Sequence, residues 1–152
     1  ATEAGAGDVL NFEEHDEVGR LEWVLERTNG RGADTTIEAT GAPDAVVQAM
    51  RFTRDAGRVV VVGQYTDHGP VSIEAAFNPH LDLNKRHLDV RGCWGSDFSH
   101  FYRGVQLTSD PVRSAPWAGL KSKLSRYALA KAKEGLSDAS VGRVIKALIS
   151  PR

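Results

Sequence analysis

The segment Gly57–Gly63 carries the clearest pattern of hydrophobic positions in the chain. Four consecutive valines stand between a Gly-Arg pair and a glycine. A continuous run of β-branched apolar residues is typical of a parallel strand that is buried on both faces, because helices then cover each face. The pattern therefore predicts an internal strand whose carboxyl end lies at Gly63.

The residues before this strand alternate between helical and strand patterns. Residues 15–32 have apolar positions spaced i, i+3, i+4 and i+7 and end in glycine-rich residues, which predicts a helix with its stop. Ala33–Gly41 is rich in β-branched residues and predicts a strand. Residues 42–56 repeat the helical spacing, with Pro43 in the first turn, where its missing N–H costs nothing. With an apolar run at Gly7–Phe12 as a first strand, this order predicts an α/β fold with a parallel sheet.

The chain beyond Gly63 predicts smaller elements. They are a short strand at Val71–Ile73, a strand at 87–95, a helix at 96–107 capped by Ser96 or Asp97, a connection at 108–123, a helix at 125–136 and a closing strand at Gly142–Ile149. The helix at 125–136 would turn Leu129, Ala132 and Leu136 inward.

Composition narrows the functional classes. With 152 residues, 41% hydrophobic and 26% charged, the chain has the size and balance of one globular domain. A net charge of −1 argues against nucleic-acid and membrane-surface partners, which need a concentrated positive field. The single cysteine, Cys93, allows no internal disulfide, which fits a reducing compartment. The first residues carry neither a secretory signal nor a methionine, so we expect them to be the cut edge of a longer polypeptide.

Glycines mark three predicted strand ends, at Gly41, Gly63 and Gly92–Gly95. In a doubly wound sheet a ligand binds beyond the carboxyl ends of the strands, and glycine lets a flat ligand approach the backbone closely. The alternative is that these glycines only end strands and start turns, and the two interpretations are evenly balanced at this point.

Other candidate chemistry is sparse. Gly5–Leu10 approaches the dinucleotide-binding motif G-x-G-x-x-G, but Leu10 replaces the third glycine, so it is not a phosphate loop. The five histidines show no metal-ligand spacing and are interpreted as surface or loop residues. Cys93 has no identifiable partner base, so a small apolar filler near a ligand is favoured over a thiol nucleophile.

Five segments spread over nearly the whole chain carry a recognisable set of motifs. They are ATEAGAGDVLNF, ADTTIEATG, GRVVVVG, NKRHLDVRGCWG and RYALAKAKEGLSDASVGRVIKALI. In this order they resemble the medium-chain dehydrogenases, the zinc-type alcohol dehydrogenase superfamily. IEATG and KRHLDVRG are more similar to the alcohol and polyol dehydrogenase branch than to the quinone reductase branch.

The resemblance implies the C-terminal half of such an enzyme. The fold would be an incomplete Rossmann-type doubly wound parallel sheet. Residues 1–107 would form the C-terminal part of the nucleotide-binding domain, and residues 108–152 a C-terminal segment with the closing helix and strand. The glycine loop and the first two strands would lie upstream, which leaves a gap beside Gly7–Phe12 in the strand order 3-2-1-4-5-6.

The resemblance also implies which residues face the cofactor, NAD or NADP. Backbone groups of the strand ends would contact the ribose and the nicotinamide; these residues are Thr40, Gly41, Val62, Gly63, Cys93 and Trp94. Lys146 would reach the pyrophosphate, and its alternative role is a solvated charge on a terminal strand. A zinc ion would belong to the intact enzyme with its ligands outside this chain, and no catalytic residue is assigned within it.

The function implied is that of a cytoplasmic nicotinamide-dependent oxidoreductase acting on a small alcohol or carbonyl. The 152-residue chain by itself is expected to be inactive. Pro70–Ala75 is expected to be an exposed edge strand that pairs with its copy in another subunit, which predicts a homo-oligomer. Two alternatives stay open, a non-catalytic association module and an unrelated α/β domain that binds a small metabolite.

Overall fold

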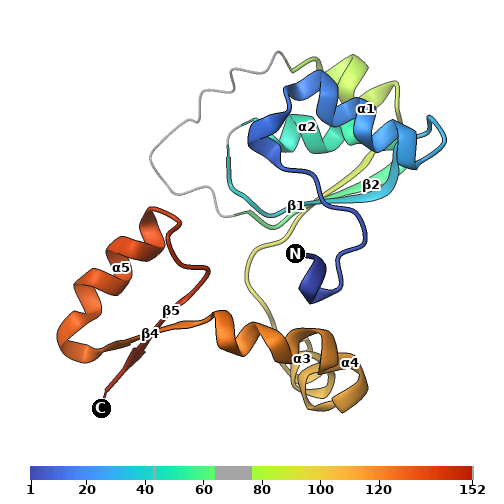
Figure 1. Cartoon of the computed structure of the whole chain (residues 1–152). Coiled ribbons are helices and arrows are strands. Elements are labelled where there is room, and N and C mark those ends of the chain that lie inside the picture. Colours follow the sequence, from blue (N-terminus) through green and yellow to red (C-terminus); the bar gives the residue numbers. More distant parts are fainter. Residues whose placement is uncertain (43, 64–76, 152) are drawn as a thin grey trace. The chain divides into compact units, whose positions relative to one another are not determined.

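The computed structural model describes residues 1–42, 44–63 and 77–151. These residues form two units, which are residues 10–95 and residues 1–9 together with 96–152 (Figure 1). The predicted division into residues 1–107 and 108–152 concerns the domains of a longer enzyme and stays a prediction. None of the helices among the described residues combines the length and the apolar character needed to cross a bilayer.

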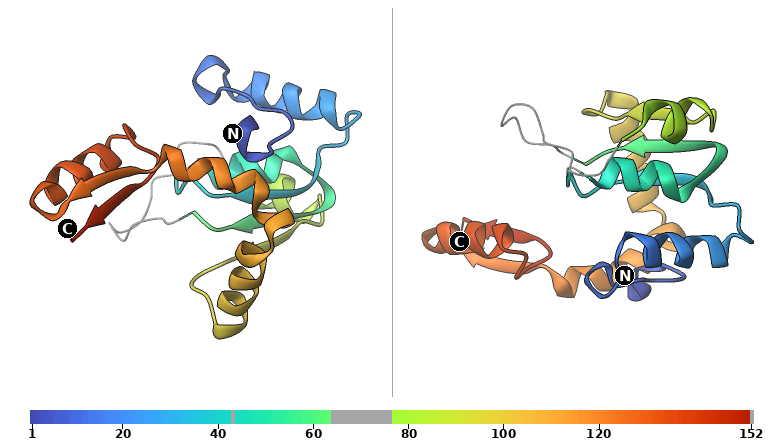
Figure 2. Two further views of the ribbon diagram at one scale, coloured as in Figure 1. Left: turned by 60° about the horizontal axis from the view of Figure 1, so that its bottom comes forward. Right: turned by 90° about the horizontal axis from the view of Figure 1, so that it is seen from above.

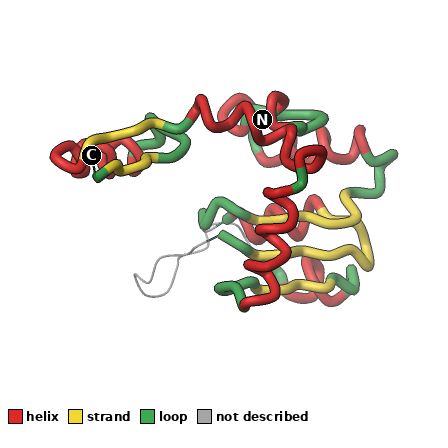
Figure 3. Tube along the Cα trace, turned by 90° about the horizontal axis from the view of Figure 1, so that it is seen from below, coloured by secondary structure: helices red, strands yellow, loops and turns green. Residues whose placement is uncertain are grey.

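The unit of residues 10–95 is built on a parallel sheet of three strands in the order β1-β2-β3. The strands are β1 (Ala33–Glu38), β2 (Thr53–Val61) and β3 (Asp89–Gly92). Figure 3 shows them side by side in yellow. Ile37 pairs with Val60 and Val60 with Arg91, so β2 lies between its two neighbours. The predicted α/β class, the parallel sheet and the central position of the valine strand are confirmed.

Helix α2 (Ala45–Phe52) covers this sheet. Its Ala49 and Met50 form the buried core with Val59 of β2, and Val46, Val61 and Leu88 pack around them. Val59 is completely buried, as a residue of an internal strand should be. The helical spacing predicted for this segment is therefore confirmed.

Helix α1 (Glu17–Arg27) ends where the sequence predicts. The Asp16 side chain accepts a hydrogen bond of 2.8 Å from Gly19 N and so caps the first turn. At the other end, Asn29 and Gly30 adopt positive φ angles of 53° and 76°, a conformation that cannot continue a right-handed helix.

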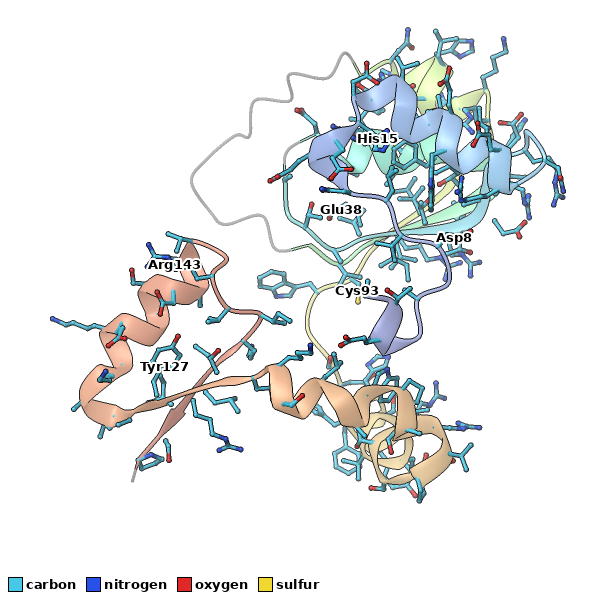
Figure 4. The ribbon with its side chains drawn as sticks, in the orientation of Figure 1. Asp8, His15, Glu38, Cys93, Tyr127 and Arg143 are labelled. Carbon is cyan, nitrogen blue, oxygen red and sulfur yellow. The ribbon has the colours of Figure 1, made fainter. Side chains whose placement is uncertain are left out.

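The other unit contains a second, smaller parallel pair, β4 (Ser125–Ala128) and β5 (Ala147–Ser150), with helix α5 (Ala132–Ser140) between them in sequence. Figure 2 shows α5 packed along this pair. The Tyr127 ring lies between α5 and the strands (Figure 4) and contacts Gly135, where a Cβ atom would come within 2.9 Å of it. Tyr127 Oη donates to Asp138 at 2.9 Å, and this bond raises the pKa of the phenol.

The rest of this unit is helical. Helix α3 (Phe98–Ser109) is capped by Asp97, whose carboxylate accepts from Ser99 N at 2.7 Å and His100 N at 3.2 Å, as predicted. Helix α4 (Pro111–Ala118) follows directly. The short 3-10 and π helices among the described residues are η1 (Thr2–Ala4), η2 (Phe12–Glu14), η3 (Pro79–Asn84), η4 (Gly119–Lys123) and η5 (Leu129–Lys131).

Three sequence predictions are wrong, and the closing strand predicted at Gly142–Ile149 is shorter, because β5 begins at Ala147. Gly7–Phe12 is not a strand; it is irregular and runs into η2. The connection predicted at 108–123 contains α4, because Pro111 stands in the first turn, where proline is tolerated, after the Asp110 cap. The segment at 125–136 begins as strand β4, and Leu129 and Leu136 are 63% and 66% exposed instead of turned inward. The edge strand predicted at Pro70–Ala75 lies outside the described residues.

Candidate functional site

The carboxyl ends of three parallel strands meet at one edge of the larger sheet. β1 ends at Glu38, β2 at Val61 and β3 at Gly92. In open α/β sheets this edge is where ligands bind. Six of the seven predicted cofactor-facing residues directly follow these ends: Thr40 and Gly41 after β1, Val62 and Gly63 after β2, and Cys93 and Trp94 after β3.

One residue, Glu38, connects the first two strand ends. Its main-chain carbonyl accepts hydrogen bonds from Val62 N at 2.8 Å and Gly63 N at 3.0 Å. Its side-chain Oε1 accepts from Thr40 N at 2.7 Å, from Thr40 Oγ1 at 2.7 Å and from Gly41 N at 2.9 Å. Figure 4 labels Glu38 at this edge. Four of the predicted site residues are thus bonded to a residue that sequence reasoning did not select.

Glu38 is nearly buried, with 3% of its surface exposed. Its neighbour Ile37 is 66% exposed, so this part of β1 inverts the usual placement of polar and apolar side chains. Removing a carboxylate from water is costly unless hydrogen bonds replace the lost hydration, and the three bonds to Oε1 replace part of it. The signal available in the sequence was a single charged residue inside a run of strand-forming residues.

The structure favours glycine at positions 63 and 41 for two different reasons. A Cβ atom on Gly63 would collide with the Glu38 carboxylate and with Gly41 N, so packing within the protein requires glycine there. A Cβ atom on Gly92 would meet nothing within 4 Å among the described residues. Gly41 has a positive φ of 73°, which favours glycine for conformational reasons. At Gly41 and Gly63, therefore, the protein's own structure explains glycine.

The third strand end is held to β2 and is open to solvent. Cys93 N donates to Val61 O at 2.9 Å, which continues the pairing of β3 with β2 by one residue. The Cys93 side chain is exposed, and Trp94 is 85% exposed. Aromatic and thiol groups are therefore accessible at this edge.

Lys146, the seventh predicted residue, belongs to the other unit. It is exposed and stands immediately before β5, and its carbonyl accepts a hydrogen bond of 3.2 Å from Ser125 N. A contact between Lys146 and a pyrophosphate stays a prediction.

A cavity of about 530 Å³ lies at the opposite, amino ends of the strands. Arg51, Arg54 and Arg86 line it, and each is paired with a carboxylate: Arg51 Nε with Asp82 at 3.4 Å, Arg54 Nε with Asp34 at 2.5 Å and Arg86 Nε with Asp55 at 3.0 Å. Arg86 also donates to Met50 O at 2.8 Å, near the end of α2. These ion pairs join helix, loop and strand, so we interpret this cavity as part of a structural network.

Comparison with known proteins decides the family. The family described as zinc-binding dehydrogenase matches residues 1–110. The chain belongs to this family. The resemblance to the zinc-type alcohol dehydrogenase superfamily inferred from the motifs is therefore confirmed.

Relatives within the family carry dehydrogenase names. The chain is 39% identical over 139 residues to an L-threonine 3-dehydrogenase of Pyrococcus abyssi. The aligned region covers 87% of this chain and 37% of that protein. It is 26% identical over 149 residues to a 5-exo-hydroxycamphor dehydrogenase of Pseudomonas putida, which covers 98% of this chain and 39% of that protein.

A solved structure agrees with this assignment. The alcohol dehydrogenase of Thermotoga maritima superposes with a TM-score of 0.83 and 28% identity over 99% of this chain and 39% of that one. The match supports the predicted correspondence to the C-terminal, nucleotide-binding part of alcohol dehydrogenase-like proteins. The chain spans about 37–39% of the length of these relatives.

Metal ligation can be tested on the side chains. In the described ranges, no group of three or more histidine, cysteine, aspartate or glutamate side chains is placed to hold a metal ion. These residues therefore do not fit a zinc site, and no chemical step through zinc is assigned to them.

Proposed function

We propose that the protein containing this chain is a nicotinamide-dependent oxidoreductase that interconverts an alcohol and a carbonyl compound. In this proposal the carboxyl ends of β1, β2 and β3 receive the nicotinamide end of NAD or NADP. The observation that carries it is the double attachment of Glu38, which brings Thr40–Gly41 and Val62–Gly63 together at the ligand-binding edge of a parallel sheet. Membership of a dehydrogenase family supports the same function.

The exposed groups at this edge fit one side of a planar ring. Thr40, Val62, Cys93 and Trp94 are all exposed, and a Cβ on Gly92 would point into open space within the described structure. The bound cofactor would supply hydride transfer; the residues of this chain would bind and orient its nicotinamide through the backbone of the strand ends. Lys146, which stands immediately before β5, would contact the pyrophosphate.

The names of the relatives suggest the substrate class. L-Threonine 3-dehydrogenase and 5-exo-hydroxycamphor dehydrogenase are both named for substrates whose reacting group is a secondary alcohol. We therefore propose a small secondary alcohol, or the ketone formed from it, as the substrate. L-Threonine is the first compound to test, because relatives with that name reach 39% identity.

The test is an assay of the gene product that contains these 152 residues. Reduction of NAD and of NADP is followed at 340 nm with L-threonine, vicinal diols, cyclic secondary alcohols and primary alcohols. We expect turnover with at least one secondary alcohol and a preference for one cofactor. Residues 1–152 alone should give none, because they contain no glycine-rich phosphate motif. Failure of the gene product to bind either cofactor would favour an association module or a different metabolite-binding domain.

Subunit association is a separate part of the proposal. We propose that Pro70–Ala75 pairs with its copy in a second subunit, as an unpaired strand edge favours. Sedimentation of the gene product at micromolar concentration should show a dimer or a larger oligomer, and replacing Ile73 by lysine should shift it toward the monomer. A strictly monomeric wild-type protein would contradict this part alone.

A further inference from the structure

Glu38 has a role that the assignment of cofactor-facing residues does not include. Three hydrogen bonds to its Oε1 come from the Thr40–Gly41 turn, two from peptide N–H groups and one from the Thr40 hydroxyl. Bonds to an ionised acceptor are about twice as strong as bonds between neutral groups. Because the carboxylate is buried, solvent does not compete for them.

The same residue orients the neighbouring turn through its main chain. Its carbonyl accepts hydrogen bonds from both Val62 N and Gly63 N. The peptide N–H groups that follow the end of β2 are therefore also directed at Glu38. The ends of β1 and β2 approach each other closely here. The Glu38 carboxylate fills the space that a Cβ atom on Gly63 would occupy. The orientation of four peptide groups at the ligand-binding edge thus depends on one side chain and its own carbonyl.

The Thr40 side chain is occupied within the protein as well. Its hydroxyl donates to Glu38 Oε1 at 2.7 Å and accepts from Ala42 N at 3.1 Å. Thr40 therefore acts as a link between Glu38 and the following turn. Its hydroxyl stabilises the turn on which a backbone contact to a ligand would depend.

We propose that Glu38 is a positioning residue, whose buried carboxylate sets the Thr40–Gly41 turn against the Val62–Gly63 turn in the orientation that binds the nicotinamide half of the cofactor. This inference rests on the proposed function. Glu38 acts through the two turns and not by contact with the reacting atoms. Its loss should weaken binding of the nicotinamide half and leave binding of the adenine half unchanged.

The binding of two ligands to one variant tests whether Glu38 positions the turns that bind the nicotinamide half. Glu38→Gln keeps the size of the side chain and one acceptor oxygen but removes the charge. The dissociation constants of NADH and of ADP, which lacks the nicotinamide and its ribose, are measured for the gene product by calorimetry. NADPH and 2′-phospho-ADP replace them for an NADP-dependent protein. The matched control is Glu22→Gln, on the exposed face of α1.

We expect Glu38→Gln to weaken NADH binding about tenfold, because charge-assisted bonds become neutral ones, and to leave ADP binding within about twofold. Hydrogen exchange at the Thr40 and Gly41 amides should be faster in this variant, and Glu22→Gln should change neither quantity. Equal weakening of both ligands, or NADH binding within about twofold of wild type, would overturn the inference.

A second variant covers the case in which Glu38→Gln does not fold. Thr40→Val removes only the hydroxyl that links Glu38 to Ala42 N. It should weaken NADH binding by about threefold and leave ADP binding unchanged, since one hydrogen bond to the carboxylate is lost while two remain. Unchanged NADH binding in this variant would also overturn the inference. If the wild-type protein binds neither ligand, the proposed function itself fails, which is a different result.

Discussion

The carboxylate of Glu38 fills the position in which a side chain on Gly63 would begin. The two residues are 25 positions apart in sequence; Glu38 ends β1 and Gly63 lies two residues beyond the end of β2. Gly63 N also donates to the Glu38 carbonyl at 3.0 Å. A buried charge and a glycine are therefore matched across β1 and β2. This pairing explains why the valine strand must end in glycine.

Replacing Gly63 by alanine should destabilise the protein. The added Cβ would collide with a buried carboxylate and with backbone at Gly41, neither of which can move freely. We expect a loss of about 1–3 kcal/mol in the free energy of unfolding, as for other overpacked sites. Urea unfolding measures it. The control is Gly92→Ala, where the Cβ has open space and the change should stay within about 0.5 kcal/mol. Equal losses in both variants would contradict the packing argument.

Gly135 of α5 should be sensitive for a similar reason. A Cβ atom there would lie 2.9 Å from the Tyr127 ring and 3.2 Å from Ile149. Overpacking should cost about 2 kcal/mol and improved helix propensity should return about 1 kcal/mol, so Gly135→Ala should lose about 1 kcal/mol net. Gly104→Ala on α3 meets no neighbour and should instead gain about 0.5–1 kcal/mol. Thermal unfolding of the two variants should shift in opposite directions.

Asp89 should make stability depend on pH in the acid range. Hydrogen bonds from Arg91 Nε at 3.1 Å and Arg58 Nε at 2.8 Å lower the pKa of Asp89 in the folded protein. The stabilisation is therefore present above the unfolded pKa of about 3.9 and is lost as the pH falls through the lower folded pKa. Wild type and Asp89→Asn should differ at pH 7 and converge toward pH 2.5 in urea unfolding. A stability difference that is independent of pH would argue against this role of Asp89. Added salt should reduce the difference at pH 7, because Asp89 is partly exposed.

Cys93 offers a direct test of the candidate site. Its thiol is exposed and follows the end of β3, so iodoacetamide should alkylate it readily. At NADH concentrations ten times the dissociation constant, the alkylation rate should fall about tenfold if bound nicotinamide covers this residue. ADP-ribose should protect much less. Mass spectrometry of the peptide that contains Cys93 measures the rate, and full reactivity in the presence of bound NADH would remove Cys93 from the site.

Local sequence patterns determined the framework of the larger unit. The valine run of β2, the helical spacing of α1 and α2, and the β-branched residues of β1 were all sufficient to predict elements that the structure contains. These patterns work because burial on one or two faces imposes a period that a short segment carries by itself. The order of motifs was likewise sufficient to identify the family, because it does not depend on how the segments pack.

The tertiary structure alone decided what depends on distant partners. Gly7–Phe12 has the composition of a strand, but a strand forms only where a neighbour completes its backbone hydrogen bonds, and the described residues pair it with none. The inward face predicted for Leu129 and Leu136 assumed that helix formation continued through a segment that begins as β4. Glu38 is the clearest case. Its sequence position suggests a surface charge. The hydrogen bonds to its carboxylate are local, from the Thr40–Gly41 turn, but the close packing of Gly63 against that carboxylate comes from the neighbouring strand, and only the tertiary structure shows it.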